Sequence, residues 1–159
     1  MALALCRVDD RLVHGQVVIG WGRPLGARFI VLVDDTVAAS PWEQDLYRMA
    51  VPEGVELTIV DTAAAIARLP EWATDRRTGI LLTGDLGTMA ALHAAHPDAL
   101  HRINLGGIHH RPGRTERLRY LYLDAEEVAL LRQLQQDGAE ITAQDLPTAV
   151  PAAVGGLLT

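Results

Sequence analysis

The chain has 159 residues, of which 49% are hydrophobic, enough for one globular domain with its own core. Its formal net charge of −6 at pH 7 argues against non-specific nucleic-acid binding, which needs a basic face. The single cysteine, Cys6, excludes an internal disulfide, and no apolar stretch approaches the ~20 residues of a membrane span. The N-terminus also lacks the pattern of a signal peptide, so we expect a cytoplasmic protein that forms one domain over residues 1–159.

Apolar runs alternate along the chain with longer amphipathic or Ala-rich segments, a pattern typical of an α/β fold. The runs predict strands at residues 2–8, 29–33, 56–60, 79–83, 101–105, 119–123 and 139–144. Helices are predicted at residues 15–24, 41–50, 62–69, 86–95 and 125–137. The stretch between the fifth and sixth strands has no helix-length pattern, which indicates a hairpin-like connection. We therefore expect an open, mostly parallel sheet of about seven strands with helices on both faces and one antiparallel strand near the C-terminal part.

Local signals mark the ends of the last predicted helix. Asp124 is a good N-cap, and the helix dipole favours Glu126 and Glu127 in the first turn. Gly138 is suited to end the helix. Residues 146–159 are rich in Pro, Ala and Gly, so we expect this tail to be loosely attached.

The most informative segment is Asp9-Asp10-Arg11-Leu12-Val13-His14-Gly15-Gln16, between the first predicted strand and the first predicted helix. Open α/β folds place their chemistry at such turns, at the carboxyl edge of the sheet. The following helix would direct unpaired N–H groups and its positive dipole end at this turn. An imidazole and a guanidinium in that position favour a phosphate-handling site, with His14 and Arg11 as its catalytic residues.

The imidazole of His14 is suited to carry a phosphoryl group. Imidazole has a reference pKa of about 6.5, which leaves a neutral, nucleophilic nitrogen at neutral pH. Phosphoryl transfer depends mostly on in-line placement and charge stabilisation, so one nucleophile, one cation and a few amides can suffice. No metal or nucleotide is required when the phosphoryl donor is itself a phosphohistidine, and in that case we expect no cofactor.

The residues around His14 have distinct expected roles. Arg11 would bind phosphoryl oxygens through its planar guanidinium, and a salt bridge to Asp9 or Asp10 is its alternative role. Because like charges repel, Asp9 and Asp10 are expected to orient Arg11 or an imidazole N–H. Gly15 lets the backbone approach closely, and the amides of Gly15 and Gln16 are candidate phosphate donors.

As a string, residues 7–17 closely resemble the phosphorylation loop of the IIB subunits of the mannose/fructose/sorbose family of the bacterial sugar phosphotransferase system. Further matches follow in chain order: Val31-Leu32-Val33-Asp34-Asp35, Met49-Ala50-Val51-Pro52, Ile103-Asn104-Leu105-Gly106-Gly107-Ile108-His109, and Leu121-Tyr122-Leu123-Asp124 through Gly138-Ala139-Glu140-Ile141. The ordered set covers nearly the whole chain and is more specific than any one piece.

The resemblance implies a protein-Nπ-phosphohistidine–sugar phosphotransferase. His14 would accept a phosphoryl group on Nδ1 from a separate phospho-IIA protein. It would then pass the group to a sugar delivered by membrane IIC and IID subunits, with which the chain would associate peripherally. The resemblance also implies that Asn104 borders the His14 loop as a further phosphate-binding residue, although Asn and Gly favour a simple turn in any case.

One local basic cluster stands out on this acidic chain, and it consists of His109, His110, Arg111, Arg114, Arg117 and Arg119. Arg111 and Arg114 are candidates for docking an acidic surface of IIA, and a solvated basic loop is the alternative. A metal site formed by His14, His109 and His110 is disfavoured. Adjacent histidines on a strand point apart, and no Cys or carboxylate falls at zinc-like spacing.

The phosphorylation loop is compatible with two functions of different kinds. The first is phosphotransfer to a sugar during transport. The alternative is a regulatory phosphocarrier, whose phosphorylation state is sensed by a partner without sugar transport. Neighbouring genes for IIC and IID would favour transport. Nucleotide binding is disfavoured, because the first turn is not glycine-rich.

Overall fold

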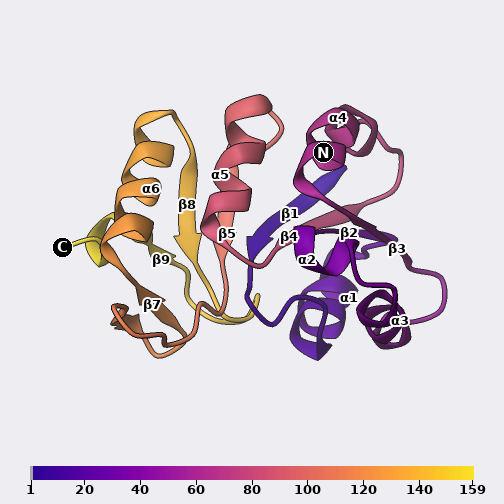
Figure 1. Ribbon diagram of the computed structural model, residues 1–159, viewed down its shortest axis with the longest axis horizontal. Coiled ribbons are helices and arrows are strands. Elements are labelled where there is room, and N and C mark those ends of the chain that lie inside the picture. The colour runs from indigo at the N-terminus through magenta and orange to yellow at the C-terminus, as the bar shows by residue number, and fades with distance from the viewer. Residues whose placement is uncertain (1) are drawn as a thin grey trace.

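The structure, a computed structural model, describes residues 2–159. Seven strands form one sheet in the order β3-β2-β4-β1-β5-β8-β9 (Figure 1). They are β1 (Leu3–Val8), β2 (Phe29–Val33), β3 (Glu56–Val60), β4 (Gly79–Thr83), β5 (Arg102–Leu105), β8 (Glu140–Ala143) and β9 (Ala152–Ala153). Each strand pairs in parallel with its neighbours, except that β9 is antiparallel to β8. The predicted α/β, mostly parallel architecture is confirmed.

Helices cover both faces of the sheet, as predicted. They are the π-helical turn η1 (Gln16–Trp21), α1 (Gly22–Leu25), α2 (Asp35–Ala38), α3 (Pro41–Ala50), α4 (Thr62–Ala73), α5 (Leu86–Ala95), α6 (Ala125–Gln136) and the short 3-10 turn η2 (Val154–Leu157). Helices α4, α5 and α6 pack on one face through buried residues such as Leu69, Met89 and Leu131. The buried side chains of Val17 and Val37 join η1 and α2 to the core on the other face.

Strands β2 and β4 are almost entirely apolar because both of their faces are covered. Every residue of β2 and β4 is buried, as is typical of parallel strands between two helical layers. Gly79 begins β4 where the Phe29 ring lies on the neighbouring strand. A Cβ at Gly79 would lie 2.1 Å from Cζ of that ring, so only glycine fits without a shift.

The expected sixth strand, residues 119–123, does not join the main sheet. Instead β7 (Leu121–Leu123) pairs with β6 (Thr115–Leu118) in a separate two-stranded antiparallel sheet. The position beside β5 is occupied by β8, which pairs with β5 over four residues. The hairpin-like connection was therefore predicted correctly, but the antiparallel strand of the main sheet comes from β9.

Residues 146–159, expected to be loosely attached, are held against the sheet. Strand β9 hydrogen bonds to β8, and the side chains of Val154 and Leu158 are buried in the core. Arg132 Nη2 donates to the Leu158 carbonyl over 2.7 Å. The Pro, Ala and Gly content was misleading, because a few apolar side chains and backbone bonds are enough to anchor a short segment.

The strand ends determine where the polar loops meet. The loop after β1 carries His14, and the loop after β5 carries His109. Both loops and the β6–β7 hairpin lie on the lower side of the molecule in Figure 1. Helix α6 begins nearby with the predicted cap at Asp124, where Asp124 and Glu127 form a reciprocal capping box. Parallel pairing of β1 with β5 brings their carboxyl ends together at this edge.

Candidate active site

The loop between β1 and η1 is fixed on both sides by the neighbouring strands. Asp9 N donates to the carbonyl of Thr83 (2.9 Å), the last residue of β4, and Asp10 N donates to the Gly107 carbonyl (2.8 Å) after β5. Leu12 adopts a left-handed backbone conformation with φ of 60°, which is strained for a residue with a Cβ. Its side chain is nevertheless buried, so the packing of Leu12 stabilises the sharp turn that leads to His14.

The ring of His14 is held by the same turn. Its Nδ1 lies 2.8 Å from the Leu12 carbonyl oxygen, which only accepts, so Nδ1 donates this hydrogen bond. Its Nε2 is buried, has no hydrogen-bond partner among residues 2–159, and lies 3.9 Å from Asp9 Oδ2. In-line attack needs an exposed lone pair. In this orientation neither ring nitrogen offers a lone pair to solvent.

Arg11 lies beside His14 and is held by two side chains. Its Nε is 3.3 Å from Asp9 Oδ1 and its Nη2 is 3.4 Å from Asp9 Oδ2. Nη2 also donates to Gln16 Oε1. The salt bridge considered from the sequence is thus formed, with Asp9 rather than Asp10. The Arg11 side chain remains 40% exposed, so it stays accessible from solvent.

Asp9 is the centre of this charge network. Its carboxylate is fully buried and accepts from Arg7 Nη2 (3.3 Å), the Arg11 backbone N–H (3.1 Å) and the Arg11 side chain. Two arginines therefore balance one buried carboxylate, and the expected orienting role of Asp9 rests on these contacts. Gly15 borders open space, because a Cβ there would meet nothing within 4 Å. The loop thus leaves room for a group bound beside His14.

Arg7 is a site residue that the sequence analysis missed. Its side chain is fully buried and donates to the carbonyls of Gln144 (2.8 Å) and Asp145 (3.0 Å) as well as to Asp9. The guanidinium also lies over the Trp21 ring, 5.0 Å from its centroid. Burial lowers the pKa of Arg7, and the Asp9 carboxylate opposes this shift. The signal was present, since Arg7 is the one charge in an apolar strand.

Asn104 occupies a different position from the one expected. It lies on β5 with its side chain nearly buried, and its Oδ1 accepts from Arg7 Nη1. A Cβ at Gly106, two residues further on, would lie 2.4 Å from Arg7 Nη2, so glycine makes space for this guanidinium. Asn104 therefore holds Arg7 within the sheet, and its contact is with β1 and not with the turn that carries His14.

Asp10 was expected to orient Arg11 or the imidazole of His14, but the imidazole that it binds is that of His109. Asp10 Oδ2 accepts from the His109 backbone N–H (2.7 Å), and Asp10 Oδ1 lies 2.6 Å from His109 Nδ1. These contacts join the loop after β1 to the loop after β5. The sequence does not indicate this contact, because the two residues lie 99 positions apart.

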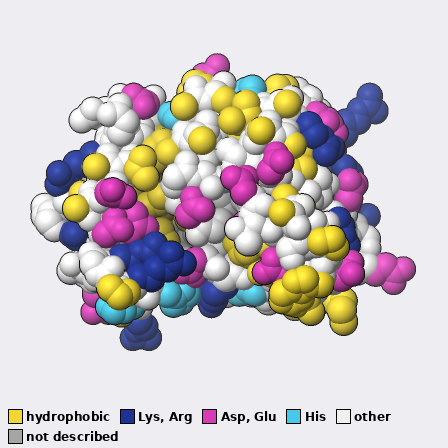
Figure 2. All heavy atoms as spheres, viewed as in Figure 1, with side chains coloured by type: hydrophobic (Ala, Val, Ile, Leu, Met, Phe, Trp, Pro, Cys, Tyr) yellow, Lys and Arg dark blue, Asp and Glu magenta, His cyan; other side chains and the backbone are white. Residues whose placement is uncertain are grey.

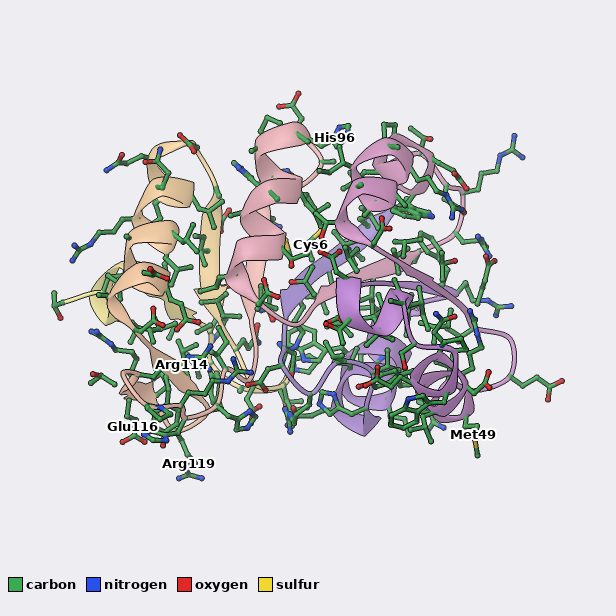
Figure 3. All side chains as sticks on the ribbon, viewed as in Figure 1. Cys6, Met49, His96, Arg114, Glu116 and Arg119 are labelled. Carbon is green, nitrogen blue, oxygen red and sulfur yellow. The ribbon has the colours of Figure 1, made fainter. Side chains whose placement is uncertain are left out.

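The basic cluster divides into free and engaged side chains. Arg114 forms a bidentate pair with Glu127 of α6, at 2.8 and 3.0 Å, so it is not free to dock a partner as expected. Arg111 is exposed. In Figure 3, Arg119 extends away from the molecule while Arg114 lies near α6. Figure 2 shows histidine and basic side chains gathered along the lower edge, where the strands end.

Other features bear on ligands and location. Among residues 2–159, no group of three or more His, Cys, Asp or Glu side chains is arranged to hold a metal ion. No helix in this part of the chain is both long and apolar enough to cross a membrane. Cys6 is buried in the sheet, and desolvation raises the pKa of its thiol to about 12, so it behaves as a small apolar residue.

Together, an open α/β sheet and a histidine on its first strand-to-helix loop define a class of domain suited to carry a phosphoryl group. The family model described as "PTS system sorbose subfamily IIB component" matches residues 3–159. The chain therefore belongs to the sorbose-type IIB family of the phosphotransferase system. Members of this family take part in phosphotransfer during sugar transport.

Several proteins are similar to this chain. The sorbose-specific EIIB component of Lacticaseibacillus casei is 32% identical over 143 residues, which cover 89% of this chain and 85% of that protein. The mannose-specific EIIAB component of Escherichia coli K12 is 28% identical, covering 93% of this chain and 46% of that longer protein. The crystal structure of the N-acetylgalactosamine-specific IIB component 1 of E. coli has a TM-score of 0.88 at 28% identity, covering 94% and 97% of the two chains.

Proposed function

We propose that His14 accepts a phosphoryl group from the phosphohistidine of a separate IIA protein and passes it to a sugar at membrane IIC and IID subunits. The observation that carries this proposal is the position of His14 on the loop after β1, beside Arg11 and above the buried Asp9. Family membership supports it, since the matched relatives are IIB components of sugar systems. The alternative of a purely regulatory carrier has no structural observation in its favour.

The ring of His14 turns in the reactive state. If Nδ1 leaves the Leu12 carbonyl, Nε2 can carry the hydrogen and direct it at Asp9 Oδ2, now 3.9 Å away. The Asp9 carboxylate would then select the tautomer in which Nδ1 has the free lone pair. This arrangement is consistent with transfer through Nδ1. A ¹⁵N-labelled phosphoprotein studied by NMR identifies the phosphorylated nitrogen directly.

Arg11 supplies the positive charge for the transferred group. Its exposed guanidinium is held by Asp9 and Gln16 and can reach a phosphoryl group on His14 while keeping part of this support. The planar fork binds two oxygens of the group at once. The backbone amides of Gly15 and Gln16 provide further donors on the same loop.

The function is tested by reconstitution. The chain is mixed with phosphoenolpyruvate carrying ³²P, the general phosphotransferase proteins and a IIA protein, and label on the chain is followed over time. We expect a label that is acid-labile and alkali-stable, as a phosphoramidate is. No label, or an acid-stable and alkali-labile label typical of an acyl phosphate on a carboxylate, would contradict the proposal.

Changes at Arg11 are expected to slow transfer to His14. Arg11→Ala removes the preorganised donor and should lower the rate by about 10²–10³-fold, and Arg11→Lys should retain part of the rate because it keeps the charge without the fork. Rapid-quench measurement of label transfer from phospho-IIA gives both rates. Transfer by Arg11→Ala at the parent's rate would show that Arg11 serves only as the partner of Asp9.

Arg111 is an exposed cation in the loop after β5, and it is the residue that we propose meets IIA. Arg111→Glu should slow the encounter with phospho-IIA by about tenfold at low salt and much less at 1 M salt, where the Debye length is about 3 Å. The matched control is Arg76→Glu, an equal charge change on an exposed residue before β4, at the opposite edge. Equal rates for the Arg111 variant and the parent at low salt would place the docking surface elsewhere.

A further inference from the structure

His109 is an exposed histidine held in one position by groups from two other parts of the fold. Its side chain is 52% exposed, yet its Nδ1 and its backbone N–H both bind the Asp10 carboxylate, over 2.6 and 2.7 Å. Its carbonyl accepts from Arg114 Nη1 over 2.7 Å. Arg114 is in turn paired with Glu127 at the start of α6. The His109 backbone and ring are thus fixed from the His14 loop on one side and from α6 on the other.

The arrangement leaves one ring nitrogen of His109 available. A carboxylate only accepts, so Nδ1 donates to Asp10 and the lone pair of the neutral ring is on Nε2. A carboxylate on Nδ1 also stabilises the ring when Nε2 takes a proton. The adjacent His110 packs edge-on against the Tyr122 ring, at 5.6 Å between centroids, and has no such carboxylate partner among residues 2–159.

His109 borders the same buried carboxylate as His14. A Cβ on Gly107 would lie 2.8 Å from His109 Cε1 and 3.5 Å from Asp9 Oδ1, so the His109 ring and the Asp9 carboxylate both lie against this glycine. On the other side of Asp9, Oδ2 is 3.9 Å from His14 Nε2. Two imidazoles therefore lie near Asp9 at the carboxyl edge of β1 and β5, that of His14 and, beside Gly107, that of His109.

We propose that His109, oriented by Asp10, is the general base that takes the proton of the acceptor hydroxyl when phospho-His14 gives up its phosphoryl group. The inference rests on the proposed function, because it assigns a residue to its second step. The acceptor oxygen forms the new O–P bond, and the N–P bond breaks with its electron pair returning to the His14 nitrogen. The hydroxyl proton moves to His109 Nε2, and the other His14 nitrogen keeps its hydrogen, so the ring leaves neutral.

The two half-reactions, loading of His14 from phospho-IIA and discharge of phospho-His14 to a hydroxyl, differ in their need for this base. Transfer from phospho-IIA joins one imidazole nitrogen to phosphorus and releases another, so no proton has to be removed from the nucleophile. Transfer to a hydroxyl does release a proton. A base held in position for that proton is typically worth 10²–10⁴-fold in rate. His109 is accordingly expected to affect the second half-reaction and not the first.

The test measures both half-reactions separately in His109→Gln, whose amide reaches the position of Nε2 but is not a base. Label is first loaded from phospho-IIA and then followed as it leaves the purified phosphoprotein, with water as the acceptor. It is followed again with membrane vesicles carrying the IIC and IID subunits, in turn with sorbose, N-acetylgalactosamine and mannose. We expect loading within about twofold of the parent, loss to water slower by about tenfold or more, and loss to the accepted sugar slower by about 10²-fold.

Two further variants provide controls. Asp10→Asn keeps the shape of the side chain but removes the charge that stabilises protonated His109, and it should slow the second half-reaction by about tenfold. His110→Gln, next in the chain, should change neither half-reaction. If His109→Gln slows loading as much as discharge, His109 belongs to the IIA docking surface or to loop structure. If discharge to water and sugar proceeds at the parent's rate, the general base is not His109. Failure of the parent to load at all would instead contradict the proposed function.

Discussion

Replacing His14 with alanine is expected to abolish phosphorylation of this chain by phospho-IIA while leaving its fold intact. The ring contributes one hydrogen bond, from Nδ1 to the Leu12 carbonyl, and lies on a loop whose backbone is fixed independently by bonds to Thr83 and Gly107. No other histidine occupies the loop after β1. The measurement is incorporation of ³²P, with the thermal midpoint of unfolding recorded for both proteins.

A matched control separates the role of this imidazole from a general effect of losing a histidine. His101 is exposed before β5, at the opposite edge of the sheet, and its Nδ1 likewise bonds a nearby carbonyl, that of Asp98 at 2.9 Å. His101→Ala should load label at the parent's rate. Label that persists on folded His14→Ala, with the acid lability of a phosphoramidate, would show that a different histidine is the phosphorylated residue.

The second large effect is expected at Arg7. Arg7→Met introduces an unbranched, apolar side chain in place of the guanidinium. The buried Asp9 carboxylate then keeps the Arg11 side chain but loses that of Arg7. The carbonyls of Gln144 and Asp145 lose the same donor. Removing one partner of a buried ion pair typically costs about 3–5 kcal/mol. We expect a loss of this size in the free energy of unfolding, measured by urea denaturation. Because Asp9 also holds Arg11, the folded fraction should load label more slowly.

The control for Arg7 is an arginine whose salt bridge is exposed. Arg102 pairs with Glu140 at 3.3 Å, and their side chains are 73% and 62% exposed. Exposed pairs contribute about 0.2–1 kcal/mol, so Arg102→Met should change stability by no more than that. If Arg7→Met were as stable as Arg102→Met, the buried network would not be needed to hold the loop.

Much of the fold could be predicted because its signals are local. Strands β1 to β4 are apolar runs bounded by polar or glycine-containing turns, and the structure places β2, β3 and β4 at the predicted residues. Helix α6 begins at the predicted Asp124 cap because the capping bonds lie within four residues of each other. Such features depend on neighbours in the chain, so the sequence is sufficient to identify them.

The structure of the C-terminal part was harder to predict from the sequence, because it depends on contacts with distant residues. Residues 121–123 have the composition of a sheet strand, but they pair with β6, since β8 occupies the place beside β5. The tail has the composition of a flexible segment, but its β9 pairs with β8 and buries Val154. A strand's composition shows that it needs a partner and does not specify which strand that partner is.

The same distinction holds for the site. The sequence by itself determined that His14 and Arg11 lie together on one strand-to-helix turn, because these residues are close neighbours in the chain. Only the tertiary structure decided that Arg7 binds Asn104, 97 residues away, and that Asp10 binds His109, 99 residues away. Both pairs depend on the parallel pairing of β1 with β5, which brings the carboxyl ends of two distant strands to one edge.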